Sequence, residues 1–282
     1  MKILVTGANG YLGSGVVNEL ILLGHEAIAA DFAVDHINEK ANRIECNLFQ
    51  IENPYEFFDK PDVLLHMAWR DGFKHNSDAH MDDLPKHFHF IKKMAESGIK
   101  QIAVMGTMHE IGFYEGVIDE NTPCNPLSFY GISKNALRNA TEVICSNNNV
   151  FFQWLRGYYI VGNTQFGASI FSKIMAAARN GQKVFPFTSG KNQYDFLDYD
   201  DFCKQVAYSA TQNEVDGIIN ICSGKPVSLA ERVERFIQEN HLDIRLEYGK
   251  FPDRPYDSAC VYGDNKKIKQ ICEEHIWKFE DI

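Results

Sequence analysis

The chain has 282 residues, 45% of them hydrophobic and 23% charged, with a formal net charge of −10. This acidic balance argues against a nucleic-acid partner, because phosphate contacts need clustered lysine and arginine. No apolar run approaches the roughly 18 residues of a membrane span, and the opening "KILVTG" lacks signal-peptide architecture. The seven cysteines form no CxxC pair, which favours reduced thiols. We therefore expect a soluble, cytoplasmic protein with no membrane partner.

Short apolar runs alternate with amphipathic stretches over about the first 160 residues. Their continuous apolarity is typical of parallel strands covered on both faces, and strand–helix alternation predicts an α/β fold with a doubly wound, Rossmann-type sheet. The predicted strands are 2–6, 26–30, 62–68, 101–106 and 151–157, and the predicted helices are 11–24, 87–98 and 133–147.

The pattern changes after about residue 163. Helical stretches at 168–181 and 229–240 are separated by short strand candidates at 217–223 and 245–249. We expect a dinucleotide-binding domain over 1–162 and a smaller C-terminal substrate lobe over 163–282, with some segments returning to the first domain.

The first strand runs into the glycine-rich turn "TGANGYLG", which holds Gly7, Gly10 and Gly13. In this type of turn the first glycine allows the tight bend, the second lets the backbone approach a pyrophosphate, and the third lets the helix pack close to the sheet. Asp31 ends the second strand 18 residues after Gly13, where a carboxylate can accept hydrogen bonds from an adenosine ribose. No arginine follows to bind a 2′-phosphate, so we predict NAD rather than NADP.

The segment "SFYGISKNALR" places Tyr130 and Lys134 at i, i+4 of a predicted helix, on one face. A free tyrosine titrates near ~10, too high for a base at neutral pH. A nearby ammonium and an oxidised nicotinamide would favour the phenolate.

Together these motifs resemble the extended short-chain dehydrogenase/reductase family of NAD-dependent nucleotide-sugar epimerases, dehydratases and reductases. The likeness covers nearly the whole chain, including "DVLLHMAW", "PLSFYGISKNALR", "WLRGYYIVGN", "YDFLDYDD", "PDRPYD" and "GDNKKIKQI".

The resemblance implies that Tyr130 exchanges a proton with a sugar C4 hydroxyl while a hydride moves to or from the nicotinamide. Lys134 would bind the nicotinamide ribose and lower the pKa of Tyr130, and Thr107 would hold the same sugar oxygen. The implied cofactor-binding residues are Gly7, Asn9, Gly10, Tyr11, Leu12, Gly13, Asp31, Asn47, Leu48, Met67, Ala68 and Lys134, and the implied substrate-binding residues are Met108, His109, Arg156 and Arg254.

His109 has two interpretations. Where the family's 4,6-dehydratases carry Asp and Glu after the threonine, this chain has Met108 and His109, which argues against dehydration. His109 is either a hydrogen-bonding wall that selects one sugar hydroxyl or a proton shuttle beside a C4 ketone. Glu110 is expected to point away from the site or to support the imidazole.

Two further features bear on the site. Tyr194 stands where the family often has an arginine that grips the diphosphate, which leaves Arg254 as the matching contact. His75, His80, His87 and His89 fit no compact ligand set, so we expect no metal site and predict a solvated loop and helix face. His66 is interpreted as a satisfied core histidine.

We therefore predict a nucleotide-sugar oxidoreductase acting at C4, either an epimerase or a 4-keto reductase. The alternatives are a catalytically silent NAD-sensing protein and a non-sugar alcohol dehydrogenase of the same family. The resemblance also implies a homodimer built on the Tyr–Lys helix and its neighbour, for which the apolar residues on these helices are Phe88, Ile91, Leu137 and Ile144.

Overall fold

A seven-stranded parallel sheet forms the centre of the molecule in the computed structural model, which describes residues 1–162, 169–252 and 257–274. The strand order is β11-β7-β5-β4-β1-β2-β3. The chain adds β2 and β3 on one side of β1 and then returns to add β4 on the other side, so the strand order switches between β1 and β4. Ligands of doubly wound sheets bind at such a switch point. The strands are β1 (Lys2–Thr6), β2 (Glu26–Asp31), β3 (Asn42–Glu45), β4 (Val63–His66), β5 (Gln101–Thr107), β7 (Phe151–Gly157) and β11 (Gly217–Ile221).

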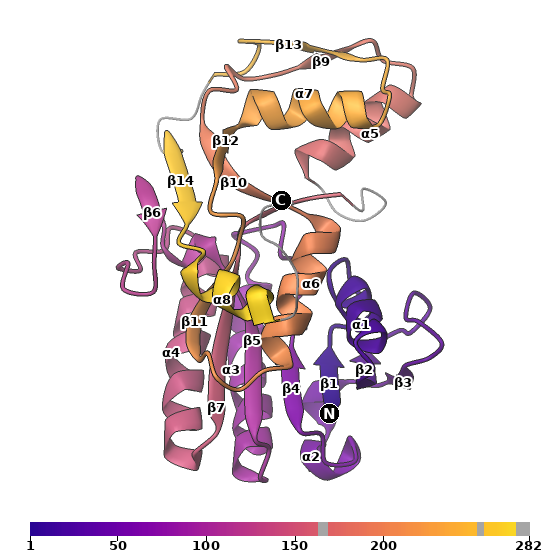
Figure 1. The fold of residues 1–282 in the computed structure, drawn as a ribbon, viewed down its shortest axis with the longest axis vertical. Helices are drawn as coiled ribbons and strands as arrows, with labels where there is room; N and C mark the ends of the chain where they lie inside the picture. The colour runs from indigo at the N-terminus through magenta and orange to yellow at the C-terminus, as the bar shows by residue number, and fades with distance from the viewer. Residues whose placement is uncertain (163–168, 253–256, 275–282) are drawn as a thin grey trace.

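Helices cover both faces of this sheet (Figure 1). One face packs on α1 (Gly13–Leu22), α6 (Tyr199–Ala210) and α8 (Lys266–Glu274). The other packs on α3 (Ala79–Glu96) and α4 (Phe129–Asn148), with the short α2 (Pro54–Phe57) near its edge. Two 3₁₀ turns, η1 (Leu48–Gln50) and η2 (Met108–Glu110), follow β3 and β5.

A smaller lobe stands at one end of the sheet, at the top of Figure 1. The hydrophobic core of this lobe is formed by residues of α5, α7 and short strands. The division of the chain into two domains at residue 162 remains a prediction. Three elements that follow this residue, α6, β11 and α8, belong to the large sheet and its core. The remaining elements are β6 (Gly116–Ile118), β8 (Tyr159–Val161), α5 (Ile170–Arg179), β9 (Val184–Pro186), β10 (Gln193–Asp198), β12 (Pro226–Ser228), α7 (Leu229–Glu239), β13 (Arg245–Glu247) and β14 (Cys260–Gly263).

The predicted α/β class and doubly wound sheet are confirmed, and the five predicted strands lie close to their expected bounds. Two helices start earlier than predicted. The helix α3 begins at Ala79 although Pro85 lies inside it, and α4 begins at Phe129, so Tyr130 is in its first turn. Pro85 is the seventh residue of α3 and has no N–H to donate to the Met81 carbonyl, so the helix continues there with one backbone hydrogen bond fewer.

The apolar residues Ile91, Leu137 and Ile144 pack inside the subunit. These residues therefore lie on the faces of α3 and α4 that pack against the core, and they do not form a dimer surface. Within the described ranges, every helix is too short or too polar to cross a bilayer.

Candidate active site

The glycine-rich turn joins β1 to α1 at the switch point of the sheet. Gly7 has φ +70°, and a Cβ added there would lie 2.7 Å from the backbone of Ala68, just beyond β4. A Cβ on Gly13 would lie 2.1 Å from the Gly7 carbonyl oxygen. Any side chain at these two positions would therefore push the turn open. The N–H groups of the first turn of α1 lie next to it, an arrangement suited to an anion.

Asp31 ends β2 and braces this turn. One carboxylate oxygen accepts the backbone N–H of Asn9 at 2.9 Å, and the other accepts that of Phe32 at 2.7 Å. The Asn9 side chain in turn accepts the backbone N–H of His36 at 2.8 Å. A carboxylate has about four lone-pair sites, so Asp31 keeps acceptor capacity for a ligand.

The other residues predicted around the cofactor have structural partners. The Tyr11 hydroxyl donates to the Gly162 carbonyl at 2.9 Å, while the Tyr11 carbonyl accepts the Tyr199 hydroxyl at 2.8 Å. Leu12 precedes α1 and, like Met67, packs against the core. The Asn47 side chain caps η1 by accepting the Phe49 N–H at 3.1 Å.

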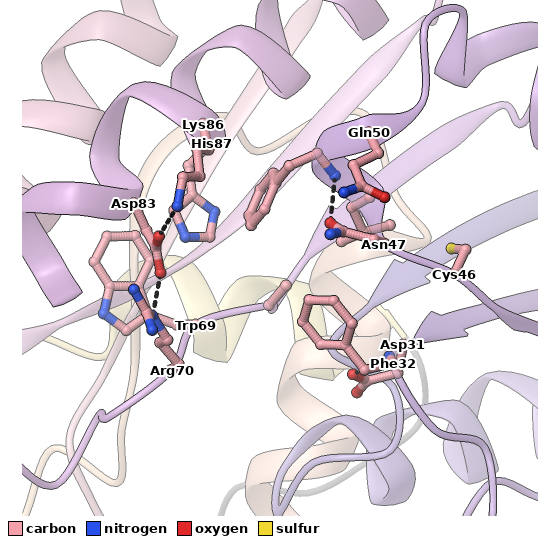
Figure 2. Close-up of a pocket in the computed structure, with 13 residues that line it drawn as sticks. Asp31, Phe32, Cys46, Asn47, Gln50, Trp69, Arg70, Asp83, Lys86 and His87 are labelled. Atoms are coloured by element: carbon pink, nitrogen blue, oxygen red, sulfur yellow. Dashed lines mark hydrogen bonds and ion pairs between the residues drawn. The ribbon is translucent and has the colours of Figure 1, made fainter.

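A cavity of about 510 Å³ opens beside Asp31, between β2, η1, the end of β4 and α3. Asp31, Asn47, Leu48 and Ala68, all predicted, line it. Figure 2 shows a charged group on the opposite side, where Asp83 pairs with Arg70 and, at 2.6 Å, with Lys86. This wall was not predicted, since Arg70 and Asp83 are 13 residues apart and only the folding of α3 onto β4 brings them together.

The helix α4 carries Tyr130 and Lys134 on one face beside the end of β5. The Tyr130 N–H donates to the His75 carbonyl at 2.9 Å, which ties the first turn of α4 to the loop after β4. The Lys134 ammonium is buried, donates to the Met105 carbonyl at 2.7 Å and lies 3.9 Å from the centre of the Trp69 ring.

Burial moves the proton affinities of this pair in opposite directions. It raises the pKa of Tyr130 to about 12, and the hydrogen bond with Thr107 opposes that rise. It lowers the pKa of Lys134 to about 7, although the Glu110 carboxylate opposes the fall. Both effects follow from the cost of holding a charge in a low-dielectric site. Without a further positive charge, Tyr130 is a neutral phenol at pH 7.

Two imidazoles flank the tyrosine. The rings of His109 and His75 are 4.3 Å apart, and His75 stacks on Tyr130 with ring centres at 5.3 Å. Burial is the main cause that lowers the pKa of both histidines, that of His109 to about 4. Both imidazoles are therefore neutral near pH 7, which favours the hydrogen-bonding interpretation of His109.

A second histidine group lies below the cavity and corrects a prediction. His80 and His87 are only 1% and 2% exposed, whereas they were expected on a solvated face. His66, interpreted as a core histidine, bonds to Thr6 through Nδ1 at 2.8 Å and to His87 through Nε2 at 2.8 Å. The Trp69 indole N–H bonds to His80 Nδ1 at 3.0 Å. In the described ranges no three His, Cys, Asp or Glu side chains gather as metal ligands.

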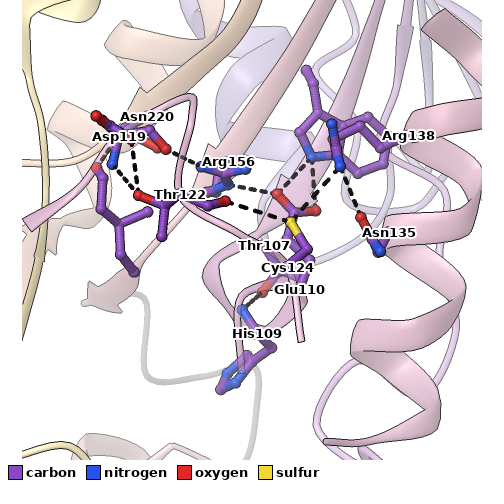
Figure 3. A network of polar contacts seen from close by, with 12 residues as sticks. Thr107, His109, Glu110, Asp119, Thr122, Cys124, Asn135, Arg138, Arg156 and Asn220 are labelled. Carbon is purple, nitrogen blue, oxygen red and sulfur yellow. Dashed lines mark hydrogen bonds and ion pairs between the residues drawn. The ribbon is translucent and has the colours of Figure 1, made fainter. Parts of the chain in front are cut away.

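Two of the predicted substrate contacts, Arg156 and Met108, are buried in the interior, and a third is not described. Arg156 is fully buried and pairs with Glu110 at 2.5 Å, because β7 directs it toward the α4 side of the sheet, where a carboxylate meets it. Met108 is 7% exposed and packs in a small core with Ile111. Figure 3 shows Glu110 directed toward Arg156 and His109 directed away from it. Arg254 lies outside the described residues.

A family model described as "NAD dependent epimerase/dehydratase family" matches residues 3–222. The chain is 44% identical over 269 residues to "dTDP-6-deoxy-L-talose 4-dehydrogenase (NAD(+))" of Aggregatibacter actinomycetemcomitans, which covers 93% of this chain and 99% of that protein. It is 25% identical to a putative UDP-glucose 4-epimerase of Methanocaldococcus jannaschii, over 95% of this chain and 92% of that one.

Solved structures share the fold. The UDP-glucose 4-epimerase of Thermotoga maritima with UDP-glucose superposes with a TM-score of 0.81 at 22% identity, over 96% of this chain and 92% of that one. The UDP-glucuronic acid 4-epimerase of Bacillus cereus with UDP-glucuronic acid and NAD gives 0.80 at 18% identity, over 97% and 93%. These likenesses show that the chain shares the fold of these proteins over nearly its whole length.

Proposed function

Since the chain belongs to the NAD dependent epimerase/dehydratase family, we propose that it is an NAD-dependent 4-dehydrogenase of a dTDP-linked 6-deoxy-hexose. In the reverse direction it reduces the 4-ketone. The observation that carries the proposal is the cluster of Tyr130, Thr107 and Lys134 at the end of β5. The 44% identical relative, matched over nearly its whole length, supports both the cofactor and the sugar class.

The cavity and the glycine turn fit NAD. A Cβ on Gly10 would meet one atom, the Gly7 carbonyl oxygen at 3.2 Å, so the outer side of the turn is open to a diphosphate. Asp31 lines the cavity and would accept the adenosine ribose hydroxyls. Phe32 follows it, 66% exposed and uncharged, so the residue directly after Asp31 offers no cation to a 2′-phosphate. Lys134 would hold the nicotinamide ribose.

The protein groups then divide the work at C4. When bound, NAD brings a positive charge and accepts the hydride from C4. The Tyr130 oxygen takes the proton of the C4 hydroxyl, leaving a ketone, and returns a proton in the reverse reaction. The Thr107 hydroxyl holds the same sugar oxygen, while charged Lys134 favours the phenolate of Tyr130. His109, a neutral imidazole, hydrogen-bonds a neighbouring sugar hydroxyl and so selects the substrate.

The diphosphate contact is the least typical part of the site. At the position where the family often has an arginine, Tyr194 packs against the Tyr159 ring with centres at 4.7 Å. We therefore propose that the substrate diphosphate is held by cations elsewhere in the small lobe, with Arg254 the first candidate.

Absorbance at 340 nm tests the proposal directly. With NAD and dTDP-6-deoxy-L-talose the absorbance should rise, and with NADH and the matching 4-keto sugar it should fall. Tyr130→Phe keeps the ring that stacks on His75 and removes only the hydroxyl, so kcat should drop by roughly 10²-fold or more. An enzyme that binds NAD by calorimetry but leaves the absorbance unchanged with both sugars would refute the dehydrogenase.

A 4-epimerase is the second candidate, favoured by the resemblance to the solved 4-epimerases. It would interconvert two sugar nucleotides without net formation of NADH. Chromatography of the same reaction mixtures separates the two functions, because an epimerase yields the C4 epimer at constant 340-nm absorbance.

We also propose a cytoplasmic homodimer. The helices α3 and α4 pack side by side and leave Met81, Ile132 and Val143 at 44%, 40% and 60% exposure. A second copy would cover this apolar stripe. Light scattering after gel filtration should give a dimer of the 32.2 kDa chain, and Val143→Glu should shift it toward the monomer.

A further inference from the structure

The segment from Thr107 to Glu110 carries the catalytic threonine at one end and a buried carboxylate at the other. Thr107 ends β5, where it pairs with Gly157 of β7, and its hydroxyl accepts the His109 N–H at 3.3 Å. Glu110 closes the 3₁₀ turn η2 and is 0% exposed. The position of Thr107 thus depends on what holds Glu110.

Two side chains of β7 hold the Glu110 carboxylate. Arg156 Nε donates to it at 2.5 Å, and Trp154 Nε1 donates at 2.9 and 3.1 Å to its two oxygens. Trp154 and Arg156 are two residues apart and so point to the same face of the sheet. Arg156 also donates to the Asp119 carbonyl at 3.0 Å. A buried carboxylate is tolerated only when it is paired and hydrogen-bonded in this way.

The first half of α4 closes on the same turn from the other side. A Cβ on Gly131 would lie 2.4 Å from the His109 carbonyl oxygen, so the helix start and η2 are in direct contact. Arg138 lies four residues after Lys134 and eight after Tyr130, on the same face of α4. It bonds to Asn135 at 2.9 Å and to the Cys124 sulfur at 3.7 Å (Figure 3). The turn that carries Thr107 is thus clamped between β7 and α4.

We propose that Glu110 and Arg156 are a positioning pair for the reaction. The pair holds the Thr107 hydroxyl next to the Tyr130 hydroxyl, and the Glu110 carboxylate supplies a negative charge close to the catalytic groups. This inference rests on the proposed function. Both side chains are 0% exposed, so neither can touch a bound substrate and neither is a catalytic residue.

The charge of Glu110 acts on both catalytic groups. The carboxylate raises the pKa of Tyr130 and that of Lys134, because a negative charge favours the protonated form of each. The titratable and charged groups facing the carboxylate from the packed elements are Arg156, Arg138, Lys134, Tyr130, Tyr158 and Cys124.

Two variants separate charge from position. Glu110→Gln keeps the shape and an acceptor for Arg156 and Trp154 but removes the negative charge. The acid limb of the kcat profile should move to lower pH, with the plateau within about threefold of the wild type. The double variant Glu110→Leu/Arg156→Met removes the anchor without leaving a buried charge unpaired. Its kcat should fall by roughly 10- to 100-fold with KM within about twofold, as expected for misplaced reacting groups.

Glu142→Gln is the matched control, since Glu142 is exposed on the outer side of α4. It should leave kcat, KM and the pH profile unchanged. If the pair has a purely structural role, the variants should differ from the wild type only in a lower melting temperature. The folded variants would then keep the plateau and the pH midpoint of the wild-type kcat profile. That result would overturn the proposal.

A readout without substrate separates this inference from the proposed function. The Tyr130 phenol titration is followed near 295 nm as the difference between each protein and its Tyr130→Phe counterpart. It should move to lower pH in Glu110→Gln even if dTDP-6-deoxy-hexoses prove not to be substrates. An unmoved titration would refute the electrostatic part of the proposal, whatever the activity.

Discussion

Replacing Lys134 with methionine should stabilise the ligand-free protein at neutral pH while abolishing its activity. Lys134 is 3% exposed, and its ammonium contacts the Met105 carbonyl and the Trp69 ring, neither of which is an anion. Methionine has nearly the same length and fills the same space without a charge. The enzyme therefore holds this buried cation at a cost in stability.

The size of the effect follows from the pKa of Lys134. Burial lowers it from 10.5 to about 7, and one pKa unit corresponds to about 1.4 kcal/mol, so the cost below pH 7 is at most about 5 kcal/mol. Between pH 7 and 10.5 the unfolded chain binds the proton more tightly than the folded one. The cost is therefore fully present below pH 7 and is lost as pH rises toward 10.5.

Urea unfolding of both proteins at several pH values measures this effect. The wild type should gain about 2 kcal/mol relative to Lys134→Met between pH 7 and 9. Taking the difference between the two proteins removes the contribution of every other titrating group. Free energies that stay parallel across this range would refute the reasoning, since they would mean that Lys134 titrates alike in both states.

Three further predictions concern the turn, the small lobe and the imidazole. Gly13→Ala should abolish NAD binding by calorimetry, because its Cβ would lie 2.1 Å from a carbonyl oxygen, whereas Gly72→Ala, with no atom within 4 Å, should bind normally. Asp195 is buried and accepts the N–H groups of Ser223, Gly224 and Gly263 at 2.8, 2.9 and 3.1 Å and the Ser223 hydroxyl at 2.7 Å. Asp195→Asn should cost about 2–4 kcal/mol in chemical unfolding, and an unchanged midpoint would contradict this. His109→Phe should raise KM by about tenfold, the loss of one hydrogen bond. Because the pKa of His109 is lowered to about 4, the dependence of kcat on pH between 6 and 8 should be the same in His109→Phe as in the wild type. A changed pH profile would indicate that His109 is a proton shuttle.

The residues that sequence reasoning located are those within one local motif. The glycine turn, Asp31 and the pair of Tyr130 and Lys134 each follow from spacing along one strand–turn–helix unit, so their contacts are encoded nearby. Thr107 was assigned from the family resemblance, and it ends β5.

The residues it missed or misplaced depend on contacts between distant segments. His75 meets His109 because the loop after β4 folds over the start of α4. His87 was expected in solvent, since nothing in a helical pattern tells a buried imidazole from an exposed one until its partner His66 is known. Arg156 was assigned to the substrate by the family resemblance, but it is buried and pairs with the Glu110 carboxylate, 46 residues away in the sequence.

The hydrogen bonds that join Thr6, His66 and His87 can run in two directions, and all three groups must share the same one. The Thr6 oxygen accepts the Ala68 N–H at 3.3 Å and has a second lone pair, so the hydroxyl can either donate to His66 Nδ1 or accept from it. If Thr6 donates, neutral His66 carries its hydrogen on Nε2 and donates to His87 Nδ1, and the hydrogen of His87 is on Nε2; if Thr6 accepts, both hydrogens are on the Nδ1 atoms. The tautomer of His87, a residue that lines the cavity, is therefore coupled to the orientation of a hydroxyl on the first strand of the sheet.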